Sequence, residues 1–145
     1  MRRISILGAT GSVGTSTLDL VERHPDWFEV VALTAATNAT ALADAARRTG
    51  AKLAVIADEA KLPELRDALA GTACRAATGH DAMLEAAAGD AEWVIAAIVG
   101  CAGLEPVMAA VEAGRTIALA NKEALVTAVH RQDGRAGALG GVGHQ

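Results

Sequence analysis

One glycine-rich segment constrains the fold more than any other part of the sequence. Gly8, Gly11 and Gly14 stand three residues apart, directly after the aliphatic run Ile4–Leu7 and before a helical stretch. In dinucleotide-binding domains the first such glycine allows a tight turn, the second lets the backbone approach a pyrophosphate, and the third lets the helix pack close to the strand. The segment therefore predicts a phosphate site rather than a plain strand-to-helix turn.

The chain up to residue 128 alternates short aliphatic runs with alanine-rich stretches, as repeated βα units do. We predict strands at Ile4–Leu7, Val30–Thr34, Leu53–Ile56, Trp93–Ile98 and Thr116–Ala120, with a further short strand at Cys74–Thr78. We predict helices at Ser16–Glu22, Thr40–Arg48, Glu59–Leu69, Asp81–Ala88 and Pro106–Glu112. This pattern predicts a Rossmann-like, doubly wound α/β fold, with a mostly parallel sheet and helices on both faces.

The end of the chain differs in character from the rest. Residues 1–128 are predicted to form one domain, whereas the stretch from His130 to Gln145 has five glycines and no helical or strand periodicity. Such a stretch cannot bury an apolar face. We therefore expect residues 129–145 to be an irregular or disordered tail.

Composition excludes several classes of partner. A net charge of −4 with 13 scattered lysines and arginines argues against a nucleic-acid surface. The nearly apolar run Trp93–Leu104 is shorter than the roughly 20 residues that span a bilayer, and the N-terminus shows no leader pattern. Cys74 and Cys101 have no metal-ligand spacing and fit a reducing compartment. We expect a cytoplasmic protein whose partners are small molecules, with no membrane contact.

Hydroxyl groups within the glycine turn strengthen the phosphate prediction. Thr10 and Ser12 can donate to phosphate oxygens, and the first N–H groups of the following helix add donors and the positive end of the helix dipole.

The segment after the second predicted strand indicates which dinucleotide binds. A carboxylate at this place would hydrogen-bond the ribose 2′-hydroxyl of NAD and repel a 2′-phosphate. The sequence instead has Ala35-Ala36-Thr37-Asn38, without a carboxylate. Thr37 and Asn38 can donate to phosphate oxygens, which favours NADPH. Asn38 is alternatively the N-cap of the next helix, and the two roles are compatible.

Two further segments follow predicted strands. Gly100 lies in a run of small residues after Trp93–Ile98, where the backbone could approach a nicotinamide ring, or form an ordinary glycine loop. Asn121, Lys122 and Glu123 follow the last predicted strand, at the edge where ligands bind in open α/β sheets. On composition alone they could equally be a solvated helix start.

These motifs together resemble a known family. The segments ILGATGSVGTSTLDLV (Ile6–Val21), AAIVGCAGL (Ala96–Leu104) and LANKEALV (Leu119–Val126) resemble the N-terminal half of the 1-deoxy-D-xylulose 5-phosphate reductoisomerases. The third segment is particularly specific to that family. The resemblance covers residues 1 to about 128.

The resemblance implies an enzyme of the non-mevalonate isoprenoid pathway. Such an enzyme rearranges a phosphorylated ketose, transfers hydride from NADPH to give 2-C-methyl-D-erythritol 4-phosphate, and uses a divalent metal, Mg²⁺ or Mn²⁺; the full-length enzyme is implied to be a homodimer. Its phosphate-binding turn corresponds to Thr10, Gly11, Ser12 and Val13, and its asparagine near the 2′-phosphate to Asn38. Asn121 and Glu123 correspond to cofactor contacts, and Lys122 to a substrate contact.

The sequence departs from the family in two places. Some members have Gly-Lys where this chain has Ala36-Thr37, and the missing lysine implies a weaker, not reversed, preference for NADPH. After Ala128 the family continues to a PVDSEH-like metal motif and a catalytic domain that this sequence does not contain, and the tail resembles a shifted reading frame or a truncated gene. We therefore expect no catalytic or metal residue in this chain, and no activity of the chain alone.

Two other interpretations stay open on the sequence. A semialdehyde dehydrogenase also uses a GATGxVG turn with NADP, but it needs a catalytic cysteine, for which Cys101 in a glycine loop is a poor candidate. A non-catalytic nucleotide-binding module, with an exposed sheet edge that pairs with another chain, is the second alternative.

Overall fold

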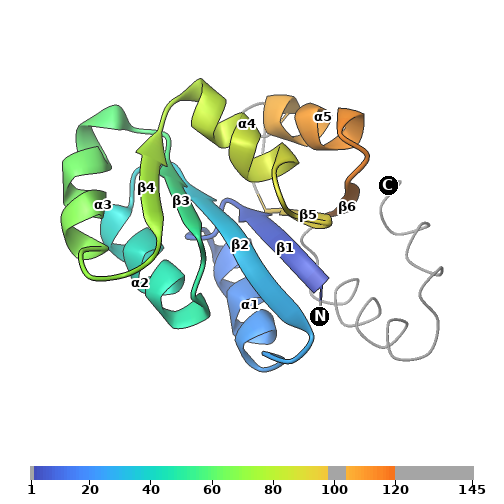
Figure 1. Cartoon of the computed structure of the whole chain (residues 1–145), viewed down its shortest axis with the longest axis horizontal. Coiled ribbons are helices and arrows are strands. Elements are labelled where there is room, and N and C mark those ends of the chain that lie inside the picture. The colour runs from blue at the N-terminus through green and yellow to red at the C-terminus, as the bar shows by residue number, and fades with distance from the viewer. Residues whose placement is uncertain (1, 98–103, 120–145) are drawn as a thin grey trace.

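The computed structural model describes residues 2–97 and 104–119, which form a six-stranded sheet with parallel neighbours throughout. The strands are β1 (Arg2–Leu7), β2 (Phe28–Ala35), β3 (Leu53–Ile56), β4 (Arg75–Thr78), β5 (Trp93–Ala96) and β6 (Thr116–Leu119). Their order is β4-β3-β2-β1-β5-β6, so β1 lies between β2 and β5 (Figure 1). The predicted parallel sheet, including the short strand near Cys74, is confirmed.

Helices cover both faces of this sheet, as predicted. They are α1 (Ser12–Glu22), α2 (Ala39–Thr49), α3 (Leu62–Ala68), α4 (His80–Ala88) and α5 (Leu104–Glu112), with a 3-10 helix at Glu59–Lys61 before α3. The first three pack on one face, and α4 and α5 lie side by side on the other (Figure 1). After β4 the chain crosses the sheet through α4 and adds β5 beside β1. The strand order therefore reverses between β1 and β5, and such a switch point is where open α/β sheets bind ligands.

The two faces have different cores because side chains alternate along each strand. Ile4 and Ile6 of β1 are buried in a cluster with leucines of α1, α2 and α3. Leu7 points to the other face, where alanines of α4 and α5 supply much of the contact. Each fully buried leucine or isoleucine stabilises the fold by about 1.5–3 kcal/mol. The face under α1–α3 therefore contributes most of the apolar stabilisation.

Helix α1 begins earlier than the sequence indicated. We predicted its start at Ser16, but it starts at Ser12, so Gly14 lies inside its first turn. Gly11 is the N-cap residue, with extended backbone angles. The earlier start is possible because Gly14 has no Cβ and lets the helix begin against the backbone of Gly8.

The other boundaries differ for local reasons. The predicted helix Glu59–Leu69 is divided into a 3-10 turn and α3. Asp58 caps the 3-10 turn, since its Oδ1 accepts from Ala60 N at 3.0 Å. Pro63 stands in the first turn of α3, where its missing N–H breaks no helical hydrogen bond. Strand β2 begins at Phe28 rather than Val30. Strand β5 ends at Ala96, and the predicted strand ends at residues 98 and 120 lie outside the described residues.

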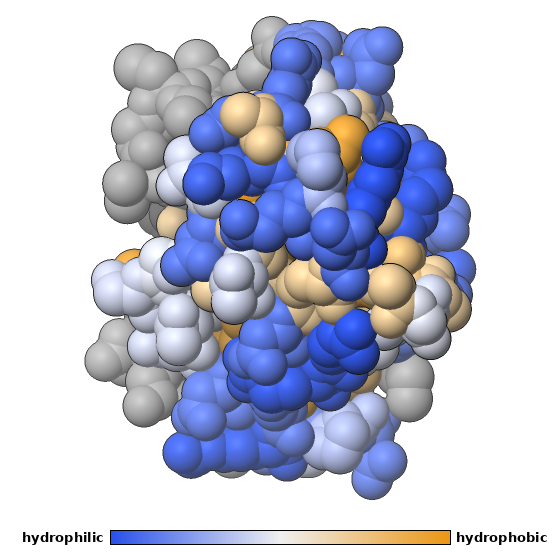
Figure 2. All heavy atoms as spheres, turned by 90° about the vertical axis from the view of Figure 1, so that its left-hand side faces the viewer, coloured by the Kyte–Doolittle hydropathy of each residue, from blue (hydrophilic) through white to orange (hydrophobic). Residues whose placement is uncertain are grey.

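Strand β4 is one edge of the sheet as described. It is only four residues long, and Arg75 at its start is exposed, features that discourage pairing with another chain. The surface over this end of the molecule is mostly hydrophilic (Figure 2). Within residues 2–97 and 104–119, none of the helices is long and apolar enough to cross a membrane.

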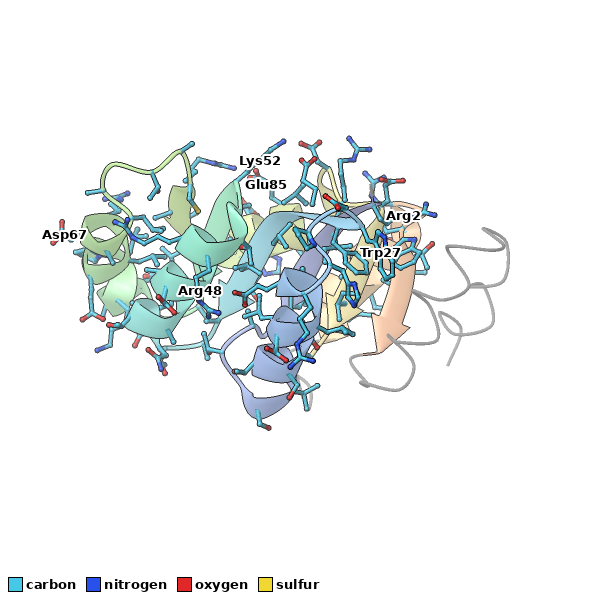
Figure 3. All side chains as sticks on the ribbon, turned by 90° about the horizontal axis from the view of Figure 1, so that it is seen from below. Arg2, Trp27, Arg48, Lys52, Asp67 and Glu85 are labelled. Atoms are coloured by element: carbon cyan, nitrogen blue, oxygen red, sulfur yellow. The ribbon has the colours of Figure 1, made fainter. Side chains whose placement is uncertain are left out.

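Charged side chains tie neighbouring elements together at the surface. Arg48 of α2 donates to Glu22 of α1 at 2.7 Å and to Asp44 of its own helix at 3.0 Å, and so lies between α1 and α2 (Figure 3). Asp67 of α3, in contrast, points outward (Figure 3). Such exposed pairs contribute little to stability, typically about 0–1 kcal/mol each.

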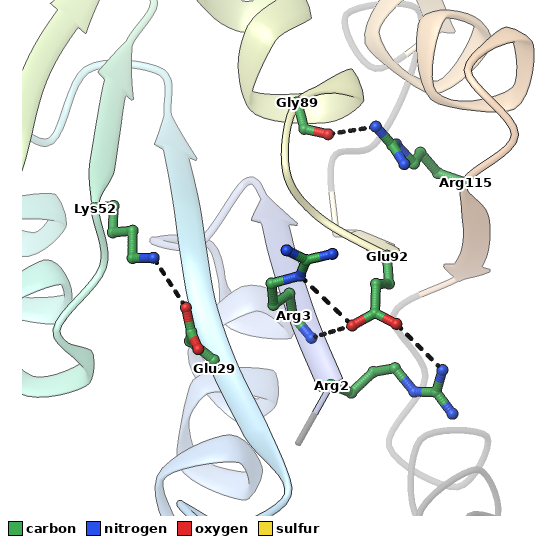
Figure 4. Close-up of polar contacts among 7 residues, drawn as sticks. All are labelled: Arg2, Arg3, Glu29, Lys52, Gly89, Glu92 and Arg115. Atoms are coloured by element: carbon green, nitrogen blue, oxygen red, sulfur yellow. Dashed lines mark hydrogen bonds and ion pairs between the residues drawn. The ribbon is translucent and has the colours of Figure 1, made fainter.

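The amino ends of the strands carry a further set of polar contacts (Figure 4). Glu92, just before β5, accepts from the backbone N–H of Arg3 at 3.1 Å and forms ion pairs with Arg2 and Arg3. Lys52 pairs with Glu29 at 3.1 Å, and Arg115 donates to the carbonyl oxygen of Gly89 at 2.5 Å. The Glu92 and Arg115 contacts connect the segment after α4 with β1 and with the start of β6, and the Lys52–Glu29 pair connects β2 with the residue before β3.

Candidate functional site

A cleft of about 340 Å³ lies at the carboxyl ends of the strands, beside the switch point. The carboxyl ends of β1, β2, β3 and β5 contribute to it, together with helices α4 and α5. Its lining residues are Gly8, Thr10, Gly11, Thr34, Ala35, Ala36, Ala57, Met83, Ala97 and Pro106. None of these described side chains is charged, so none of them repels an anion.

The glycine turn forms one wall of this cleft, and two of its glycines are required by geometry. Gly8 has φ +81°, a left-handed conformation that other residues rarely adopt. A Cβ at Gly14 would lie 2.1 Å from the carbonyl oxygen of Gly8 and 2.8 Å from backbone atoms of Ala9. Gly14 therefore permits the close packing of α1 on the turn that the sequence predicted.

Gly11 differs from its two neighbours. A Cβ at this position would have its nearest neighbour, the Gly8 carbonyl oxygen, at 4.0 Å, and φ is −75°. The protein's own packing therefore does not require glycine at residue 11. A glycine here instead keeps the approach from outside clear, as a bound pyrophosphate would need.

The N-terminus of α1, which directly follows the glycine turn, has no side-chain cap. Gly11 has no side chain to accept from the first N–H groups of the helix, and the first turn holds no acidic residue. Thr15 donates back to Gly11 O at 2.8 Å, and Gly11, Ser12 and Val13 are exposed. The arrangement offers backbone donors and a positive dipole end to an anion.

Thr34, at the end of β2, was not identified from the sequence. Its Oγ1 accepts from the N–H of Gly8 at 2.9 Å, and its carbonyl oxygen accepts from the N–H of Ala9 at 2.7 Å. Thr34 is 1% exposed. Threonine is common in strands, so nothing in the sequence distinguished it from an ordinary core residue.

The segment after β2 is placed where the sequence predicted. Thr37 and Asn38 are exposed between the end of β2 and the start of α2. Asn38 is the N-cap of α2: its Oδ1 accepts from Ala41 N at 3.0 Å. This capping bond does not use the Nδ2 hydrogens, so it is compatible with donation to a phosphate oxygen.

Four of the predicted site residues cannot be placed. Gly100, Asn121, Lys122 and Glu123 lie outside the described residues. The strands that precede them in the chain, β5 and β6, end at Ala96 and Leu119, at the same edge of the sheet as the glycine turn.

Other reactive side chains lie away from the cleft. Burial raises the pKa of the Cys74 thiol, which packs against the core, and His24 stacks on Trp27 with ring centroids 4.2 Å apart. In the part of the chain that the structure describes, no three His, Cys, Asp or Glu side chains lie close enough together to hold a metal ion. Cys101, the cysteine considered for a dehydrogenase, lies outside that part.

Comparisons with known proteins agree with one another. The family model for 1-deoxy-D-xylulose 5-phosphate reductoisomerase matches residues 4–129. The reductoisomerases of Zymomonas mobilis and Rhizobium meliloti are each 57% identical, over 127 and 129 residues. Each match covers 88% of this chain and 33% of the relative, so the chain spans about a third of these curated relatives' length. The sequence motifs had suggested that it corresponds to the N-terminal half of the family enzyme.

Solved structures give the same result. The Zymomonas mobilis reductoisomerase in complex with NADPH matches with a TM-score of 0.79 and 57% identity, over 88% of this chain and 34% of that one. A DOX-P reductoisomerase in complex with NADPH, fosmidomycin and magnesium matches with a TM-score of 0.78 and 35% identity, over 88% and 32%.

Proposed function

This chain belongs to the 1-deoxy-D-xylulose 5-phosphate reductoisomerase family, and on that premise we propose that it binds NADPH in the cleft beside the glycine turn. The observation that carries the proposal is the turn itself, with its left-handed Gly8, its open approach at Gly11 and its uncapped helix. The 57% identical relative solved with NADPH supports it.

The pyrophosphate is proposed to bind at the start of α1. Backbone N–H groups of Gly11, Ser12 and Val13 would donate to its oxygens, and the hydroxyls of Thr10 and Ser12 would add further hydrogen bonds. The clearance at Gly11 supports this position, because any larger residue there would stand between the helix N-terminus and the ligand.

The 2′-phosphate is proposed to bind beside Thr37 and Asn38. Both residues are exposed, and the described residues that line the cleft next to them are uncharged. No carboxylate stands in the segment Ala35–Asn38 itself, and donors at this place in the sequence favour NADPH over NADH. The apolar side chains of Ala57 and Met83, on the opposite wall, suit the flat face of the adenine ring.

The nicotinamide end and the substrate are assigned from the family resemblance alone. Gly100, Asn121 and Glu123 are proposed cofactor contacts, and Lys122 is the proposed substrate contact. In this proposal residues 1–128 form the cofactor-binding domain. NADPH would supply the hydride of the family's reaction, and this chain's residues would bind and orient it.

The complete reaction is proposed for the longer family enzyme. It comprises rearrangement of the phosphorylated ketose and hydride transfer, with a divalent metal, and the homodimer implied by the resemblance belongs to that enzyme. Because the chain spans about a third of its curated relatives, we propose that the 145-residue chain binds NADPH without turning over 1-deoxy-D-xylulose 5-phosphate. Metal-dependent NADPH oxidation by this chain would contradict that part.

Fluorescence titration tests the proposal. NADPH added to the 145-residue chain should bind saturably and more tightly than NADH, because only NADPH carries the 2′-phosphate. The absence of binding by either nucleotide would overturn the proposed function, and equal affinity for both would overturn the roles of Thr37 and Asn38.

A further inference from the structure

We propose that Thr34 is a positioning residue that fixes the glycine turn in its binding conformation before the cofactor arrives. The proposal rests on the proposed function, because it concerns the same cleft. Thr34 makes two hydrogen bonds to successive residues of the turn: its Oγ1 accepts from Gly8 N at 2.9 Å, and its carbonyl oxygen accepts from Ala9 N at 2.7 Å.

These bonds hold the two peptide groups on either side of the Gly8 Cα. Gly8 has φ +81°, and a glycine populates both signs of φ with similar ease. The backbone of Gly8 therefore needs an external partner to hold one conformation. A side chain on the neighbouring strand supplies it, and Thr34 is itself held at 1% exposure in the core.

The position of Gly8 in turn determines where α1 starts. The space for a Cβ at Gly14 is filled by the carbonyl oxygen of Gly8, at 2.1 Å, and by backbone atoms of Ala9. Rotation of the Gly8–Ala9 peptide would therefore move the surface against which the first turn of α1 packs. The uncapped donors of Ser12 and Val13 depend on that surface for their direction.

The hydroxyl group, rather than the size of the side chain, carries this role. Valine has nearly the same shape as threonine but cannot accept a hydrogen bond, so Thr34→Val leaves the N–H of Gly8 without its partner. The Ala9 bond, which uses the backbone of residue 34, is retained. Serine keeps the acceptor and loses only a methyl group, so Thr34→Ser is the conservative variant.

The expected loss of NADPH affinity follows from how often the glycine turn adopts its binding conformation. When the binding-competent state is partly depopulated, the apparent affinity falls by the same factor. Loss of one buried hydrogen bond shifts such an equilibrium by about 3- to 10-fold. We therefore expect Thr34→Val to weaken NADPH binding by about 3- to 10-fold, and Thr34→Ser to stay within about twofold of the unaltered chain.

A matched control exists two strands away. Thr78 of β4 donates its hydroxyl to the carbonyl oxygen of Ile56 at 2.5 Å, another cross-strand bond near the carboxyl edge, but it does not contact the turn. Thr78→Val removes a comparable bond and should leave NADPH affinity unchanged. If it weakens binding as much as Thr34→Val does, the effect is general destabilisation and the proposal is wrong.

Hydrogen exchange gives a second readout that does not need NADPH. In the chain without nucleotide, Thr34→Val should speed exchange at the Gly8 amide by about 3- to 10-fold, and Thr34→Ser should restore protection. Unchanged exchange at Gly8 would overturn the proposal even if NADPH binding fell. If the unaltered chain fails to bind NADPH, the proposed function fails, and the Gly8 amide still decides the role of Thr34.

Discussion

Two cavities of similar volume lie at opposite ends of the strands, and they differ in charge. The cleft at the carboxyl ends measures about 340 Å³ and none of its lining residues in the described part of the chain is charged, whereas a cavity of about 380 Å³ near the amino ends is lined by Lys52, Arg75, Glu85 and Asp90. There, Lys52 pairs with Glu29, and Arg75 with Glu85.

Polar groups therefore have different roles at the two ends of the sheet. At the amino ends, ion pairs link β1 with the residues before β5 and β2 with the residue before β3, and Arg115 donates to the carbonyl oxygen just after α4 (Figure 4). At the carboxyl ends, the backbone donors of α1 have no side-chain cap. Unsatisfied donors without a competing carboxylate suit an anionic ligand, and ion pairs already formed do not. We therefore expect substitutions at the carboxyl ends to affect binding, and substitutions at the amino ends to affect stability only.

The largest effect is expected from Gly14→Ala. The new Cβ would lie 2.1 Å from the Gly8 carbonyl oxygen, so α1 must shift from the turn. We expect loss of measurable NADPH binding and a free energy of unfolding lower by about 3 kcal/mol, measured by nucleotide titration and urea unfolding.

Gly89→Ala is the matched control at the other end of the sheet. Its Cβ would lie 2.6 Å from the carbonyl oxygen of Glu85, at the end of α4. This variant should also be less stable but should keep its NADPH affinity. Equal loss of binding in both variants would remove the distinction between the two ends.

Gly11→Ala should separate binding from stability. The protein has room for this Cβ, with the nearest neighbour at 4.0 Å, so the free energy of unfolding should change by less than about 1 kcal/mol. The methyl group would occupy the approach to the α1 N-terminus, and we expect NADPH affinity about tenfold weaker, corresponding to about 1.4 kcal/mol. Unchanged affinity in a titration would mean that the pyrophosphate does not approach at Gly11.

A smaller change is expected when a positive charge is introduced beside the proposed 2′-phosphate site. Thr37→Lys restores the residue that some family members have and should tighten NADPH binding by about 3- to 10-fold at low salt, with NADH affinity unchanged. Ala70→Lys, also exposed but between the end of α3 and the start of β4, controls for net charge. An equal gain for both nucleotides would contradict the placement of the 2′-phosphate.

The smallest effect is expected at the amino ends, from Glu92→Gln. The backbone N–H of Arg3, followed by the charges of Arg2 and Arg3, holds the pKa of Glu92 below its ordinary value of 4.5. A lowered folded-state pKa means that the ionised group stabilises the fold above its unfolded pKa, and that this contribution disappears as the pH falls through the folded pKa.

The unaltered chain should therefore be more stable than Glu92→Gln near neutral pH, by less than about 1 kcal/mol because the carboxylate is partly exposed. The difference should vanish in acid below the ordinary glutamate pKa. Chemical unfolding at several pH values measures it, and NADPH affinity should not change. A difference that grows in acid would contradict the role of this carboxylate.

The sequence predicted the sheet well because the pattern of β1, β2 and β3 is strong. Runs such as Leu53–Ile56 are apolar on both faces, as buried parallel strands require, and the glycine turn marked the end of the first strand. Even the short β4, a run without strong periodicity, was anticipated from its place after a helix.

The boundaries and the partner residues of the turn were harder to predict. The start of α1 depends on a contact between Gly14 and Gly8 that has no sequence periodicity, and Thr34 acts through a bond across 26 residues of sequence. Met83 reaches the cleft from α4, on the opposite face from α1, which becomes evident only once the crossover is known. Tertiary contacts, rather than local propensity, decide these features.

Amide chemical shifts recorded with and without NADPH test the central claim most directly. We predict that the largest changes fall on Gly8 to Gly14 and on Thr37 and Asn38, at the carboxyl ends of β1 and β2, while Glu29, Lys52 and Glu92 at the amino ends stay unchanged. Large changes at the amino ends, with none in the glycine turn, would contradict it.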